Sequence, residues 1–185
     1  MKKVKSKTRV KVEVKEGEAV KGENSRFVRA DKRNIVQEIK PDVFRLPGEM
    51  GKFLQDLQPY KCAIAISGDP HAGKTEFVTQ LIDSFCSIKK KVGFYSLEQG
   101  GMESKDTEAA IDRNVSKNNQ EYLFVTGIVD GLPGIKHECK DFDVIVIDSW
   151  QELKEPSTAF NSLRNEYPEK IWVIIFQQNS AGGTR

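Results

Sequence analysis

The sequence predicts an α/β fold in which a mostly parallel central sheet carries helices on both faces. A glycine-rich loop at residues 68–75 (GDPHAGKT) follows an apolar stretch and precedes a segment whose apolar residues recur at helical spacing. Further apolar stretches occur at residues 91–97, 122–125, 143–148 and 170–176, with polar or helical segments between them. Continuous apolar strands that alternate with helices are typical of parallel sheets buried on both faces.

Residues 1–45 are expected to form a basic arm and a lead-in segment ahead of a core at residues 46–185. Lysine or arginine alternates with valine, serine or threonine along most of residues 3–15, and a period of two predicts a strand. Its cationic face would suit a phosphate backbone, or the strand would add to the sheet of a neighbouring subunit. The alternative is a solvated arm or an edge strand guarded by lysines. A short helix is expected over residues 50–57.

The core elements follow in order. Residues 61–67 predict a buried strand that enters the glycine-rich loop, and residues 74–89 predict the helix that leaves it. That helix has one apolar face, formed by Phe77, Val78, Leu81, Ile82, Phe85 and Ile88. Strands are expected at residues 91–97, 122–125, 143–148 and 170–176, and helical segments at residues 107–114, 132–140 and 157–167.

Composition excludes several classes of protein. The chain has 185 residues, 38% hydrophobic and 30% charged, which suits one domain with a core of its own. The net charge of +2 hides a basic N-terminal region, because residues 1–33 hold twelve basic and five acidic residues. The longest apolar run is too short to span a membrane, so we expect a cytoplasmic protein. The cysteines, Cys62, Cys86 and Cys139, are spaced like reduced core residues rather than a disulfide framework or a zinc site.

The loop at residues 68–75 matches the phosphate-binding pattern G-x-x-x-x-G-K-[ST] at every fixed position. Glycines let backbone N–H groups converge on phosphate oxygens, the lysine reaches the β- and γ-phosphates, and the hydroxyl after it ligates Mg²⁺. The predicted nucleotide-binding residues are Gly68, Asp69, Pro70, His71, Ala72, Gly73, Lys74 and Thr75. The alternative, a chance glycine turn between a strand and a helix, requires all four fixed positions to match by accident.

Three other strand ends carry functional groups: Glu98, Asp148 and Gln177. Ligands bind beyond the carboxyl ends of the strands in open parallel sheets, so these groups are expected to share a site with the loop. Asp148 is predicted to hold Mg²⁺ with Thr75, and Glu98 to orient a water for attack on the γ-phosphate. Gln177 is predicted to sense the γ-phosphate. The alternatives are an exposed loop carboxylate for Glu98 and a plain polar strand end for Gln177, with Gln178 and Asn179 as competitors.

Four segments together resemble the ATPase core of the RecA-like family, in the branch of DnaB-like helicases and RadA/Sms-type recombination ATPases. They are GDPHAGKT, FYSLEQG, VIVIDSWQEL and IIFQQNSAGGTR, and the similarity covers about residues 50–185. The resemblance implies a three-layer P-loop NTPase fold and an oligomeric ATPase that uses ATP and Mg²⁺ and acts on DNA, more often single-stranded. It also implies catalytic roles for Lys74, Glu98 and Gln177, the last coupling ATP to DNA-binding loops.

The family pattern usually continues beyond the position of Arg185, so we expect the core to be incomplete at its C-terminus. Two other function classes stay open. A small-molecule kinase shares the phosphate loop and the Mg²⁺ acid but needs an acceptor pocket and usually a lid that bears arginines. An assembly or packaging component would hold ATP with little turnover.

Overall fold

The computed structural model describes residues 42–177, and these form an α/β fold. Its main sheet has five strands in the order β3-β7-β6-β4-β5, and every neighbouring pair is parallel. The strands are β3 (Ala63–Gly68), β4 (Val92–Ser96), β5 (Leu123–Thr126), β6 (Val144–Asp148) and β7 (Ile171–Gln177). The predicted parallel sheet is therefore confirmed, and the strand order shows that β7 returns to lie between β3 and β6.

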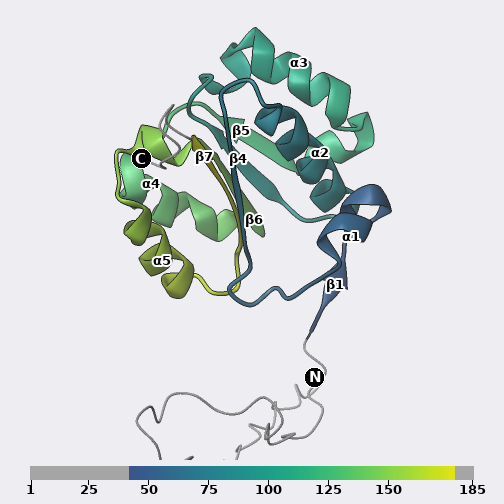
Figure 1. Ribbon diagram of the computed structural model, residues 1–185, viewed down its shortest axis with the longest axis horizontal. Helices are drawn as coiled ribbons and strands as arrows, with labels where there is room; N and C mark the ends of the chain where they lie inside the picture. Colours follow the sequence, from purple (N-terminus) through teal and green to yellow (C-terminus); the bar gives the residue numbers. More distant parts are fainter. Residues whose placement is uncertain (1–41, 178–185) are drawn as a thin grey trace, which may run out of the picture. The chain divides into compact units, whose positions relative to one another are not determined.

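Helices lie on both faces of this sheet, as predicted. The helices are α1 (Gly48–Leu54), α2 (Lys74–Ser87), α3 (Lys105–Asn114), α4 (Gly131–Glu138) and α5 (Ser157–Glu166). Short 3-10 helices are η2 (Gly101–Glu103), η3 (Lys117–Tyr122), η4 (Cys139–Asp141) and η5 (Trp150–Leu153). Figure 1 shows α4 and α5 on one side of the sheet, and α1, α2 and α3 on the other.

The alternation of side chains along the central strands produces two separate cores. In β6, Val144 and Val146 join one cluster of buried residues, whereas Ile145 and Ile147 join the other. Strand β7 divides its residues in the same way, so both faces of each strand are covered. A strand buried on both faces needs a continuous apolar run, which explains why β6 and β7 are easy to recognise in the sequence.

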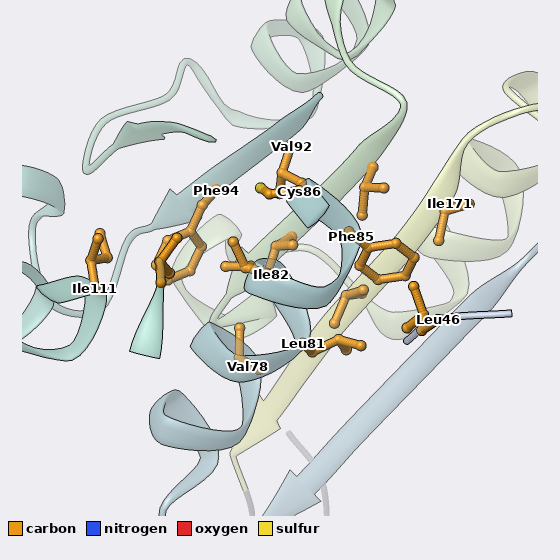
Figure 2. Close-up of a cluster of buried hydrophobic side chains, with 14 of the residues drawn as sticks. Leu46, Val78, Leu81, Ile82, Phe85, Cys86, Val92, Phe94, Ile111 and Ile171 are labelled. Atoms are coloured by element: carbon orange, nitrogen blue, oxygen red, sulfur yellow. The ribbon is translucent and has the colours of Figure 1, made fainter. Parts of the chain in front are cut away.

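Helix α2 covers the first of these cores with the apolar face that its spacing predicts. Val78, Leu81, Ile82 and Phe85 are at most 1% exposed, and Figure 2 shows them beside Val92 and Phe94 of β4 and Ile171 of β7. Burying four such side chains contributes roughly 1.5 to 3 kcal/mol for each of them. Helix α2 is therefore held firmly on the sheet, with its N-terminus directly after the glycine-rich loop.

For the segment before the loop, the prediction of a buried strand is wrong, and the predicted helix is present with shifted ends. In the sheet formed by residues 42–177, strand β3 is an edge strand rather than a buried one, because β7 is its partner on one side and alternate residues, Ala63, Ala65 and Ser67, are exposed. The short helix expected over residues 50–57 is present, but it spans Gly48–Leu54. Gln55, with a φ of 58°, ends that helix. The next two residues form β2 (Asp56–Leu57), which pairs with β1 (Phe44–Arg45) in an antiparallel ribbon.

The ribbon of β1 and β2 belongs to the core. The ring centroid of Phe44 lies 6.3 Å from that of Phe85 in α2, and Leu46 is 2% exposed. Contacts within the chain separate residues 1–40 from residues 41–185. The core therefore starts a few residues earlier than the boundary at residue 45 that the sequence predicts.

Several predictions fall outside the described residues. The basic arm at residues 3–15, the candidate competitors Gln178 and Asn179, and the C-terminal segment all lie there. Within residues 42–177, none of the helices has the length and apolar character that crossing a membrane requires.

Candidate functional site

The carboxyl ends of four adjacent strands bring the predicted site residues to one edge of the sheet. Gly68 of β3 is in register with Gln177 of β7, and Ser96 of β4 is in register with Asp148 of β6. Because all four strands are parallel, the loops that leave them also start at this edge. The glycine-rich loop follows β3, and Glu98 lies two residues beyond the end of β4.

The glycine-rich loop runs from β3 to the N-terminus of α2. The Nζ of Lys74 donates hydrogen bonds to the carbonyl oxygens of Gly68 and Asp69, at 3.0 and 2.7 Å. The loop turns by a hydrogen bond from the Ala72 N–H to the Asp69 carbonyl (3.2 Å), and Gly73 has a φ of 80°, which favours glycine. Asp69, Pro70, His71 and Ala72 are exposed, and no side chain caps α2 among the described residues. The backbone N–H groups at the start of α2 are thus available to an anion.

Thr75 and Asp148, the two predicted Mg²⁺ ligands, lie side by side. The hydroxyl of Thr75 donates a hydrogen bond to Oδ2 of Asp148 at 3.3 Å, across 73 residues of sequence. Hydroxyl and carboxylate oxygens are the hard ligands that Mg²⁺ prefers. Beside them, Ser149 has a buried hydroxyl with no hydrogen-bond partner among residues 42–177. An unpaired buried hydroxyl fits a site that receives a further polar group when a ligand binds.

Asp148 is a buried acid with unusual electrostatics. The residue is 2% exposed, and the pKa of its carboxyl group is raised to about 6, with burial as the largest cause. The negative charge of Glu98 also contributes to the rise, whereas the Thr75 hydrogen bond and the charge of Lys74 oppose it. A cation that binds Asp148 would stabilise its ionised carboxylate, because the positive charge offsets both the cost of burial and the repulsion from Glu98.

Asp148→Asn is expected to raise the free energy of unfolding of the ligand-free protein at pH 8. The pKa of about 6 in the folded chain exceeds the ordinary value of 3.8, so the folded state loses stability as pH rises through about 6. Asparagine keeps an acceptor for Thr75 without the charge. The gain should reach roughly 2 to 3 kcal/mol at pH 8 and disappear below about pH 4.

Urea unfolding of both proteins across this pH range measures the difference. Asp141→Asn is the matched control, because Asp141 is an exposed aspartate in η4, and it should show no such gain at pH 8. An Asp148→Asn protein that is less stable than wild type at pH 8 would contradict this prediction. It would show that other groups offset the buried charge of Asp148 in the ligand-free chain.

Glu98 lies in a tight turn that connects β4 to η2. Its backbone N–H donates to the carbonyl oxygen of Asp148 at 3.0 Å, and the Gly100 N–H donates to the carbonyl oxygen of Ser96 at 2.9 Å. The Glu98 side chain is exposed. The structure therefore places an accessible carboxylate next to the buried acid Asp148, and their electrostatic interaction agrees with this proximity.

Gln177 is held by a residue that the sequence analysis missed. The side-chain amide of Gln151 in η5 accepts a hydrogen bond from the Gln177 N–H at 3.2 Å and donates one to the Gln177 carbonyl at 3.1 Å. This pair of bonds fixes the end of β7 to the segment that follows Asp148. A polar residue three positions after an acid gives no signal by itself. The adjacency of β6 and β7, which creates the contact, is not visible in the sequence.

Comparisons with known proteins assign no family to the chain. Neither the family models nor the curated proteins give a match to this sequence. The arrangement of residues at the strand ends is therefore the basis on which a function can be proposed.

Proposed function

We propose that this chain is a RecA-like P-loop ATPase that binds and hydrolyses ATP with Mg²⁺ and acts on DNA as an oligomer of identical subunits. The observation that carries the proposal is the contact between Thr75, at the end of the glycine-rich loop, and Asp148, at the end of β6. A phosphate loop alone binds an anion, but a phosphate loop with a carboxylate beside its hydroxyl fits a nucleotide with its metal.

Each residue of the site has a role that its position supports. The Lys74 ammonium donates to loop carbonyl oxygens in the ligand-free chain, and it would exchange these for phosphate oxygens, which are stronger acceptors. Backbone N–H groups of the loop and of the first turn of α2 would hold the remaining oxygens. Thr75 and Asp148 would hold Mg²⁺, which supplies charge neutralisation to the phosphates when it is bound.

Glu98 is the candidate group for activating the attacking water. It is exposed at the same edge of the sheet as Lys74 and Asp148, and its backbone is tied to Asp148. The carboxylate would accept a hydrogen bond from water and orient its oxygen towards the γ-phosphate. Asp148 is poorly suited to this task, since its carboxyl group is buried and engaged with Thr75.

The strand order supports a coupling role for Gln177. Strand β7 lies between β3 and β6. Its last residue, Gln177, is in register with Gly68 at the start of the phosphate loop, and Gln151, in the segment after Asp148, is hydrogen-bonded to it. A change at the γ-phosphate would therefore reach Gln177 directly and then the residues that follow it. The DNA-binding and oligomeric parts of the proposal rest on the sequence resemblance and on the basic arm.

Phosphoryl transfer to a small molecule is the second candidate function. A cleft of about 380 Å³ lies beside the Glu98 turn, and its lining includes Leu97, Glu152 and Lys154. Such a cleft would receive a small acceptor near the site of phosphate transfer. The arginine-bearing lid that usually accompanies this reaction is not found among residues 42–177, where Arg113 pairs with Glu76.

Phosphate release from ATP by the full chain distinguishes these functions. We expect release that requires Mg²⁺ and increases with single-stranded DNA, together with a larger mass in solution when ATP is present. Transfer of phosphate to a metabolite without DNA stimulation would favour the kinase. Tight ATP binding with no release, with or without DNA, would favour an assembly component instead.

A further inference from the structure

Glu98 lies between two residues that are both tied to the same buried hydroxyl. Ser96 precedes it at the end of β4, and Gln99 follows it. The Oγ1 of Thr107 in α3 lies 3.1 Å from the Ser96 hydroxyl and donates to Oε1 of Gln99 at 3.0 Å. Ser96 and Thr107 are both 0% exposed. The turn that carries the proposed catalytic residue is thus attached to α3 on both sides of Glu98.

The hydrogen bonds of this group have one direction. A hydroxyl has a single proton, and Thr107 uses its proton for Gln99. Ser96 must then be the donor to Thr107. Thr107 is therefore both an acceptor and a donor in a series of hydrogen bonds that runs from Ser96 of β4 to Gln99 in the turn. Removal of its hydroxyl would leave Ser96 without an acceptor and Gln99 without a donor.

The backbone of the same turn is also held by contacts with segments other than α3. A side chain added at Gly101 or at Gly127 would overlap the backbone of the other segment, so the turn packs directly against the residue that follows β5. The N–H of Glu98 is bonded to Asp148. With these backbone contacts in place, the hydroxyl of Thr107 sets how the turn lies against α3.

Helix α3 is also attached to the helix that follows the phosphate loop. Asn114, at the end of α3, donates to Oε2 of Glu76 at 2.6 Å and to the Thr79 hydroxyl at 2.9 Å. Arg113 forms an ion pair with the same glutamate. Glu76 directly follows Thr75, so α3 connects the first turn of α2 at one end to the Glu98 turn at the other.

We propose that Thr107 is a positioning residue that sets the place of the Glu98 carboxylate relative to the bound triphosphate, with α3 as the connecting element. This inference rests on the proposed function, because it takes Glu98 as the group that orients the attacking water. Misplacing a reacting group by about 1 Å costs on the order of 10² in rate. Loss of the Thr107 hydroxyl should therefore lower kcat about 10- to 100-fold and change the affinity for ATP less than about threefold.

Thr107→Val tests this, because valine has the shape of threonine without the hydroxyl. Thr107→Ser should restore turnover, since serine supplies the same donor and acceptor. Gln99→Met removes the acceptor at the other end of this hydrogen-bond chain. Because Gln99 is half-buried, this variant provides the test if Thr107→Val does not fold. Amide hydrogen exchange of residues 96–101, measured without nucleotide, should be faster in Thr107→Val and Gln99→Met than in wild type and Thr107→Ser.

A double-mutant cycle with Glu98→Gln separates positioning from general stability. In single-turnover measurements, Thr107→Val should slow ATP cleavage in the wild-type background and have no further effect in the Glu98→Gln background. Equal slowing by Thr107→Val in both backgrounds would overturn the inference and leave the proposed function standing. So would wild-type cleavage by Thr107→Val alone, when Glu98→Gln alone is slow. A Glu98→Gln protein with wild-type turnover would overturn the role of Glu98, and the inference with it.

Discussion

Lys74→Ala is expected to abolish measurable ATP binding and leave the fold intact. The Nζ of Lys74 lies over the loop and donates to two of its carbonyl oxygens, so in the ligand-free chain its charge contributes little to the core. With ATP bound, the same group would make hydrogen bonds to phosphate that contribute about 1.5 to 3 kcal/mol each. Loss of two such bonds weakens affinity by a factor on the order of 10² to 10⁴.

Calorimetric titration with Mg²⁺ and ATP measures this loss, and urea unfolding checks the fold. Lys140→Ala is the matched control, because Lys140 is an exposed lysine in η4, ahead of the amino end of β6. It should bind ATP as wild type does. If Lys74→Ala binds ATP with unchanged affinity, residues 68–75 are not a phosphate-binding loop.

Glu98→Gln is expected to lower ATP turnover by a factor on the order of 10² to 10⁴, with ATP affinity close to wild type. Glutamine has the size of glutamate but cannot accept a proton from water. The backbone bonds of the turn do not involve the side chain, so the variant should keep the geometry of the site. Single-turnover cleavage and equilibrium binding, measured on the same preparation, separate chemistry from binding.

Glu103→Gln is the control for this prediction. Glu103 is an exposed glutamate in η2, five positions further along the chain, and its replacement should leave turnover unchanged. Loss of turnover in Glu103→Gln with full activity in Glu98→Gln would show that Glu98 is the wrong carboxylate.

The elements that carry the site could be predicted because their signals are local. Helix α2 shows its buried face through the spacing of Val78, Leu81, Ile82 and Phe85, and the observed helix ends within two residues of the predicted position. Strands β6 and β7 are buried on both faces, so their apolar runs are continuous. The ends of such strands are well defined, and they placed Asp148 and Gln177 at the correct edge of the sheet.

Features that depend on strand order could not be predicted. An edge strand and a central strand have similar apolar composition, so the exposure of β3 became visible only when β7 was seen to be its neighbour. The bonds from Gln151 to Gln177 require β6 and β7 to be adjacent. Thr107 belongs to a polar helix, where a threonine is ordinary, and its contact with Ser96 depends on how α3 packs.

A triphosphate and Mg²⁺ are proposed to bind at the junction of the glycine-rich loop and β6. Calorimetric titration of the wild-type chain, residues 1–185, with ATP, in Mg²⁺ and again in a chelator, tests this most directly. We expect saturable binding of one ATP per chain that is tighter with Mg²⁺, because Thr75 and Asp148 are placed to share the metal. Heats equal to those of dilution in both conditions would contradict the account.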